Sequence, residues 1–103
     1  MAMLQGNVKK SDPKYFTNLK LTAIKIEEFG FSLLFGFNKQ MDVTTHWELV
    51  DTKEGKIIDR GMALKIREQF LLFKLIGTKL VKFIKDPFSA ELFFDNDLKL
   101  VVY

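Results

Sequence analysis

Three short runs of strand-forming residues near the end of the chain constrain the fold more than any other feature of the sequence. Leu80 to Ile84, Ala90 to Phe94 and Leu98 to Tyr103 are rich in leucine, β-branched and aromatic residues. Asp86-Pro87 separates the first run from the second because proline lacks a backbone donor, and Asp95-Asn96-Asp97 separates the second from the third. The sequence therefore predicts an antiparallel meander in this region.

The same pattern occurs earlier in the chain at an offset of 59 residues, the difference between positions 80 and 21. At this offset apolar residues coincide without a gap: Leu21 with Leu80, Phe29 with Phe88, Leu33 with Leu92, and Phe35 with Phe94. Asn18 coincides with Gly77, and both residue types suit the left-handed position that closes a helix. Two copies of helix, cap and antiparallel strands are therefore expected. Chance similarity between two meanders is the alternative.

Each copy is expected to begin with a helix. A short one runs from Pro13 to Thr17 after the candidate N-caps Ser11 and Asp12, and a main helix covers Ala63 to Ile76. The expected fold class is therefore α+β, with antiparallel sheets from two pseudo-repeated helix-plus-meander halves. The whole chain, 1–103, is expected to form one domain.

The segments between these elements are expected to add strands. Leu19 to Glu28 and Phe31 to Asn38 form a hairpin around Phe29-Gly30, with Phe31, Leu33, Phe35 and Phe37 directed toward the core. Val43 to Asp51 and Lys56 to Asp59 form a further strand pair. Residues 1–10 are expected to be a flexible tail.

Composition limits the class of protein. With 103 residues and 48% hydrophobic content, the chain can bury a core without covalent staples. It has no cysteine and no run near the ~18 apolar residues of a membrane span, so a cytoplasmic protein is expected. The net charge is +3, and basic residues gather between Lys65 and Lys85. These lysines are either a solvated face or a patch for phosphate or an acidic partner.

The inventory of reactive side chains does not favour an enzyme. There is one histidine, no cysteine, and no glycine-rich phosphate loop or zinc-protease motif. His46 and Glu48 share one face of a strand and could pass a proton, although an incidental surface pair explains them as well. No cofactor or metal site is expected, and Asp95 and Asp97 are interpreted as turn residues.

Two regions are candidate partner-binding surfaces. The first is the segment around the inserted strand pair, where the candidate residues are His46, Trp47, Glu48, Asp59 and Arg60. The second is an apolar stripe on the expected main helix, formed by Leu64, Leu71 and Leu75 opposite the stripe that would cover the sheet. Burial of Trp47 and of the stripe in the core is the alternative in each case.

Several of these segments resemble a group of small bacterial proteins of unknown function that are described as immunity-protein-like and occur beside polymorphic or contact-dependent toxins. The matching segments are Leu75-Ile76-Gly77-Thr78-Lys79-Leu80-Val81, Ala90-Glu91-Leu92-Phe93-Phe94-Asp95-Asn96, Leu98-Lys99-Leu100, Trp47-Glu48-Leu49 and Gly55-Lys56-Ile57-Ile58. Asp97 stands where glycine is common in that group. Every matched position is structural, so the resemblance transfers no chemistry.

The resemblance implies a non-catalytic protein-binding module that neutralises a cognate toxin. Because inhibitors of nucleases tend to be acidic and this chain is basic, the resemblance fits a non-nuclease toxin or a toxin with an acidic surface better. A self-associating structural protein, forming a homodimer through an edge strand or the spare apolar stripe, is the first alternative. A basic nucleic-acid-binding protein is the second.

Overall fold

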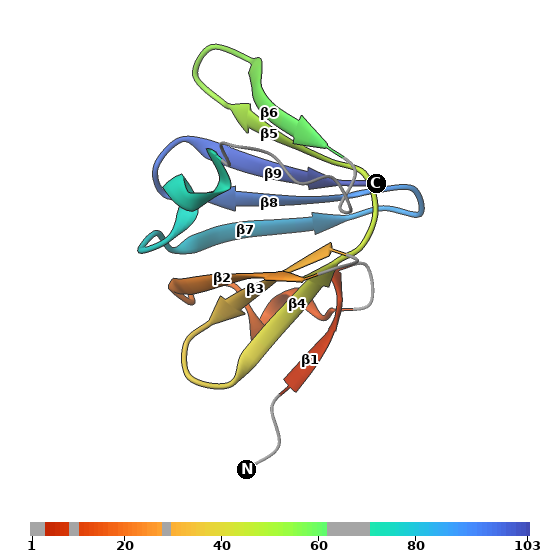
Figure 1. The fold of residues 1–103 in the computed structure, drawn as a ribbon. Coiled ribbons are helices and arrows are strands. Elements are labelled where there is room, and N and C mark those ends of the chain that lie inside the picture. The colour runs from red at the N-terminus through yellow and green to blue at the C-terminus, as the bar shows by residue number, and fades with distance from the viewer. Residues whose placement is uncertain (1–3, 9–10, 28–29, 62–70) are drawn as a thin grey trace.

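The computed structural model describes residues 4–8, 11–27, 30–61 and 71–103. The strands are β1 (Leu4–Asn7), β2 (Leu21–Glu27), β3 (Gly30–Phe35), β4 (Lys39–Val43), β5 (Trp47–Asp51), β6 (Lys56–Gly61), β7 (Leu80–Lys85), β8 (Ala90–Phe94) and β9 (Leu98–Val102). They form a four-stranded sheet, in the order β1-β4-β3-β2, and a five-stranded sheet, in the order β6-β5-β9-β8-β7 (Figure 1). Neighbouring strands are antiparallel except for β1 and β4.

The expected α+β class is wrong, because the described residues are mostly strand. Of the expected main helix, residues 71–75 form a 3-10 helix, η3 (Leu71–Leu75), and residues 63–70 lie outside the described residues. Leu72 and Leu75 are both fully buried, and a 3-10 helix places side chains three residues apart on one side. The expected first helix is likewise a single 3-10 turn, η2 (Pro13–Tyr15), capped by Asp12. Apolar spacing alone did not distinguish these short turns from longer helices.

The beginning of the chain also differs from expectation. Residues 1–10 were expected to be a flexible tail, whereas Leu4–Asn7 form β1 and Val8 is fully buried. β1 joins the four-stranded sheet through main-chain pairing with β4, from Leu4 opposite Lys39 to Asn7 opposite Asp42. A short strand held by its backbone leaves little trace in the side-chain pattern.

The segment between β3 and β5 is divided differently from the expected strands. A turn at residues 36–38 separates β3 from β4, and Gly36 has a φ of +57° in this turn. Phe37 therefore leaves the apolar face of β3 and is fully exposed. Residues 44–46 then carry the chain from the four-stranded sheet to the five-stranded sheet.

The 59-residue offset relates the two sheets strand by strand. β2, β3 and β4 correspond to β7, β8 and β9, and the strand registers agree at this offset. Both copies even share a register shift at the same place, between Leu21 and Ala23 in β2 and between Leu80 and Lys82 in β7. Asn18 and Gly77, which coincide at the offset, have positive φ values of 73° and 90°.

The two sheets are joined where β2 and β7 begin, by hydrogen bonds that repeat under the same offset. Lys20 and Lys79 form an isolated antiparallel bridge. Leu21 N donates to Thr78 O over 2.7 Å, and its equivalent Leu80 N donates to Leu19 O over 2.9 Å. The junction is therefore a pseudo-two-fold contact within one chain, and it directs the inner faces of both sheets toward a common core.

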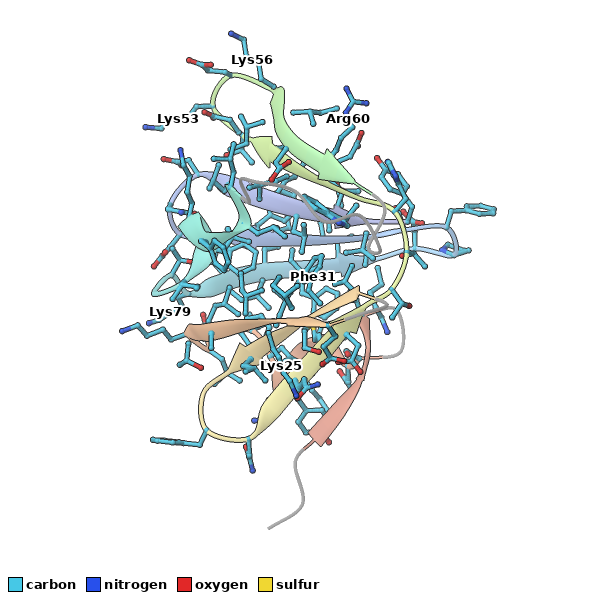
Figure 2. The ribbon with its side chains drawn as sticks, viewed as in Figure 1. Lys25, Phe31, Lys53, Lys56, Arg60 and Lys79 are labelled. Atoms are coloured by element: carbon cyan, nitrogen blue, oxygen red, sulfur yellow. The ribbon has the colours of Figure 1, made fainter. Side chains whose placement is uncertain are left out.

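That core lies between the sheets and contains the apolar faces of both copies. Phe31 from β3 lies between the two sheets (Figure 2) and meets the ring of Trp47 from β5 edge-on, with centroids 5.6 Å apart. Phe16 and Phe35 make a second edge-to-face pair at 5.7 Å. These contacts leave the opposite face of each sheet available to solvent.

Candidate functional site

The single histidine of the chain lies at one end of the five-stranded sheet. His46 is half-buried just before β5, and its ring centroid lies 5.5 Å from that of Tyr103, which follows β9. Tyr103 N donates a hydrogen bond of 2.9 Å to His46 O, which fixes the two residues side by side. Antiparallel pairing of β5 with β9 brings them together from distant parts of the sequence.

Glu48 completes this cluster. The hydroxyl of Tyr103 donates to Glu48 Oε1 over 2.5 Å. This hydrogen bond is the largest cause that raises the pKa of Tyr103 above its usual value, followed by burial and by the negative charges of Glu48 and Glu91. The Glu48 carboxylate is therefore engaged by the phenol of Tyr103.

Asp59 and Arg60 are neighbours on β6 but have different environments. Asp59 is buried, and its carboxylate accepts hydrogen bonds from Arg60 N at 2.9 Å and from Leu71 N at 3.0 Å. It fastens β6 to η3. Arg60 is exposed on the outermost strand of the five-stranded sheet (Figure 2), and its register partner on β5 is Glu48. Of the two residues, Arg60 is accessible to a partner.

The remaining candidate residues belong to the interior or lie outside the described residues. Trp47 and Leu75 are buried in the core, and Leu71 is partly buried against it. Leu64 lies outside the described residues. The structure thus brings His46, Glu48 and Arg60 to one surface and separates them from Trp47, Asp59, Leu71 and Leu75.

That surface is the solvent-facing side of the five-stranded sheet, here called the outer face. Strand register places its residues in two rows across the sheet: Arg60, Glu48, Val101, Glu91 and Ile84, and then Ile57, Val50, Lys99, Phe93 and Lys82. Tyr103 extends the first row. Ile57, Ile84 and Tyr103 are 43%, 39% and 41% exposed, so large apolar side chains on this face contact solvent.

Phe93 lies in the second row between two lysines. The ammonium groups of Lys82 and Lys99 lie 5.5 and 5.3 Å from the centroid of its ring. Lys99 also pairs with Glu91 at 2.8 Å. Lys82 joins this face because β7 pairs with β8, and Tyr103 joins it because β9 pairs with β5.

A polar cluster occupies the solvent-facing side of the four-stranded sheet. The hydroxyl of Ser32, which is itself buried, lies 2.7 Å from Asp42 Oδ1 and 3.1 Å from Glu27 Oε1, and Gln40 Nε2 donates to both Ser32 and Asp42. Its members come from β2, β3 and β4, so it specifies their register. The single histidine of the chain, His46, lies in the segment before β5 and outside this cluster.

Within the part of the chain that the structure describes, no three histidine, cysteine or acidic side chains are grouped as metal ligands would be. No helix among these residues is long and apolar enough to cross a membrane. No model of a known protein family, no curated protein and no solved structure matches the chain.

Proposed function

We propose that this chain is a non-catalytic protein-binding module and that the outer face of the five-stranded sheet is its contact surface. The observation that carries the proposal is the side-chain content of that face. Ile57, Ile84 and Tyr103 are exposed on it, and Tyr103, Glu48 and Arg60 lie at one end. Aromatic and arginine side chains beside apolar groups are typical of the residues that dominate protein interfaces.

The shape of the edge strands supports binding of a partner to a sheet face instead of to a sheet edge. β2 and β7 each contain a register shift near their start, and the β5–β6 pair contains one between Leu49 and Val50. Such bulges bend an edge strand and disfavour pairing with a foreign strand. A homodimer formed by strand addition at β2, β6 or β7 is therefore disfavoured.

The lysines around Phe93 count against a nucleic-acid platform. A base that stacks on an aromatic side chain needs one open ring face. Because Lys82 and Lys99 already place ammonium groups near this ring, stacking would first have to displace them. The charges on this face suit carboxylates of a protein partner instead.

The partner that we propose is a toxin whose contact surface is acidic. The resemblance to immunity-type proteins supports a toxin, and the basic net charge of +3 supports the acidic surface. The proposal includes a cytoplasmic location, which suits a chain without cysteine.

Two matched isoleucines provide the test. Ile84 on β7 lies on the outer face and is 39% exposed, whereas Ile26 on β2 of the other sheet is 47% exposed. A protein encoded beside this one would be titrated by calorimetry with the native chain, Ile84→Asp, Arg60→Glu and Ile26→Asp. We expect Ile84→Asp and Arg60→Glu to weaken binding at least about tenfold, or ~1.4 kcal/mol, and Ile26→Asp to leave it nearly unchanged.

Growth protection would show whether the interaction neutralises a toxin. Cells that express the neighbouring protein should survive with the native chain and with Ile26→Asp but not with Ile84→Asp. Equal binding by all variants would reject the outer face as the contact surface. Absence of any binding, together with tight salt-dependent binding to DNA or RNA, would reject the protein-binding function itself.

A further inference from the structure

A phenylalanine side chain is held in solvent at the β7–β8 turn. Phe88 is 83% exposed. The turn beneath it is fixed by Asp86, whose Oδ1 accepts hydrogen bonds of 2.8 Å from both Phe88 N and Ser89 N. Ser89 Oγ donates to Asp86 Oδ2 over 3.1 Å, and Asp86 N donates to Ser89 O over 2.9 Å. Because hydrogen bonds of Asp86 and Ser89 hold this turn while the ring is mostly exposed, Phe88 is presented as an apolar projection.

An apolar cavity opens beside the β3–β4 turn of the other sheet. Its volume is about 210 Å³, and it is lined by Leu19, Phe35, Gly36, Phe37, Asn38 and Lys39. An apolar cavity of roughly 150 Å³ is sufficient to hold benzene, whereas pockets for drug-sized ligands begin at roughly 300 Å³. The cavity therefore has the size for a single aromatic ring.

The repeat shows that this cavity is specific to the first copy. At the 59-residue offset, Lys39 corresponds to Leu98 and Phe37 corresponds to Asn96. In the second copy Leu98 is buried and Asn96 Nδ2 donates to Lys74 O over 3.0 Å, so the equivalent turn is held against η3. In the first copy Phe37 is fully exposed, and Phe37 and Lys39 both line the cavity.

We propose that Phe88 of one molecule inserts into this cavity of a second copy of the chain. The size of the cavity matches one phenyl ring, and Asp86, two residues before Phe88, and Lys39, which lines the cavity, carry opposite charges. The β7–β8 turn and the β3–β4 turn lie on opposite sides of the molecule (Figure 1), so Phe88 cannot reach the cavity of its own molecule. The contact is head-to-tail, and such a contact builds open chains of molecules unless the rotation closes a ring.

Complementation between two variants tests this contact. Phe88→Ala removes the ring, and Lys39→Leu fills the cavity as Leu98 does in the second copy. Sedimentation velocity over a wide range of concentrations should show assembly of the native chain beyond a dimer. Each variant alone should associate at least about 30-fold more weakly, the fold-change that corresponds to the ~2 kcal/mol of an interface hot spot. An equimolar mixture should form a dimer and stop there, because only one intact ring meets one intact cavity.

Two controls separate insertion from other effects. Tyr15→Ala removes an exposed aromatic ring that belongs to neither feature, and it should assemble like the native chain. Lys39→Gln removes the charge without filling the cavity, and it should weaken assembly less than Lys39→Leu does. Thermal unfolding of each variant would establish that it is folded.

Any of three results would overturn the proposal. The first is a native chain that remains monomeric at every concentration. The second is a Phe88→Ala variant that assembles like the native chain, and the third is a mixture of the two variants that fails to form a dimer. Since Ile84→Asp changes neither feature, it should still assemble, which keeps this test independent of the outer-face interaction.

Discussion

Replacement of Gly30 by alanine tests how the backbones of β3 and β4 approach each other. Gly30 begins β3 with a φ of +154°, a conformation that residues with a side chain rarely adopt. A Cβ atom at this position would lie 2.2 Å from Val43 O and 3.2 Å from Val43 C, both of which belong to the backbone of β4. Backbone atoms cannot rotate away as the end of a side chain can, so β3 and β4 would have to separate.

The expected loss of stability has two parts. The strained φ costs of the order of 1–3 kcal/mol. Separation of the strands adds the loss of about one or two hydrogen bonds, at ~1 kcal/mol each. A total of about 2–5 kcal/mol is a large share of the roughly 5–15 kcal/mol that stabilises a typical domain. It corresponds to a fall in Tm of about 8 °C or more for a chain of this length.

Gly55 provides the matched control. It also has a positive φ, +69°, but a Cβ atom there would meet no other atom within 4 Å. Gly55→Ala should therefore cost only the ~1–2 kcal/mol of a left-handed residue. Urea unfolding followed by the fluorescence of Trp47, the single tryptophan and a buried one, would measure both free energies of unfolding. If Gly30→Ala costs no more than Gly55→Ala, the close approach of the strands is refuted.

Two further predictions concern the junction and the aromatic cluster. Gly77 has a φ of +90° and open space around it, and its equivalent in the first copy is Asn18. Gly77→Asn should therefore lower the free energy of unfolding by less than ~1 kcal/mol. Gly77→Val should lower it by about 1–2 kcal/mol more in the same unfolding assay. The raised pKa of Tyr103 means that its hydrogen bond to Glu48 stabilises the fold below the usual tyrosine pKa and is lost as the pH rises through the folded-state pKa. The Tyr15→Phe variant leaves Tyr103 as the only tyrosine, and its absorbance titration should show that this phenol ionises above the ordinary tyrosine range. Adding Glu48→Gln should lower the pKa of Tyr103. An unchanged titration midpoint would contradict the hydrogen bond to Glu48 as the cause.

Local signals in the sequence identified the elements whose shape depends on neighbouring residues. The strands at Leu80, Ala90 and Leu98 begin where the runs of strand-forming residues begin, and Asn18 and Gly77 take the left-handed conformation that their residue types suggest. The expected main helix was wrong in the described part because burial of Leu72 and Leu75 satisfies a tight turn as well as a helix. β1 was missed because it depends on main-chain pairing.

The candidate surface depended on contacts that the sequence does not contain locally. His46, Glu48 and Arg60 were recognised from one strand pair, but Tyr103 joins them only because β9 pairs with β5. The position of Phe93 between Lys82 and Lys99 requires the register of three strands. Trp47 and Leu75 were candidates because an apolar side chain looks the same in a core and at an interface until its neighbours are known.

The sequence by itself determined where the strands and turns of the second meander lie and the offset that relates it to the first, because strand propensity and turn chemistry act over a few adjacent residues. Only the tertiary structure decided which strands become neighbours, how the two copies join at Lys20 and Lys79, and which aromatic residues are buried and which are exposed. Those choices depend on pairing between segments that are distant in the chain. A face of a sheet therefore exists only after the strands have paired.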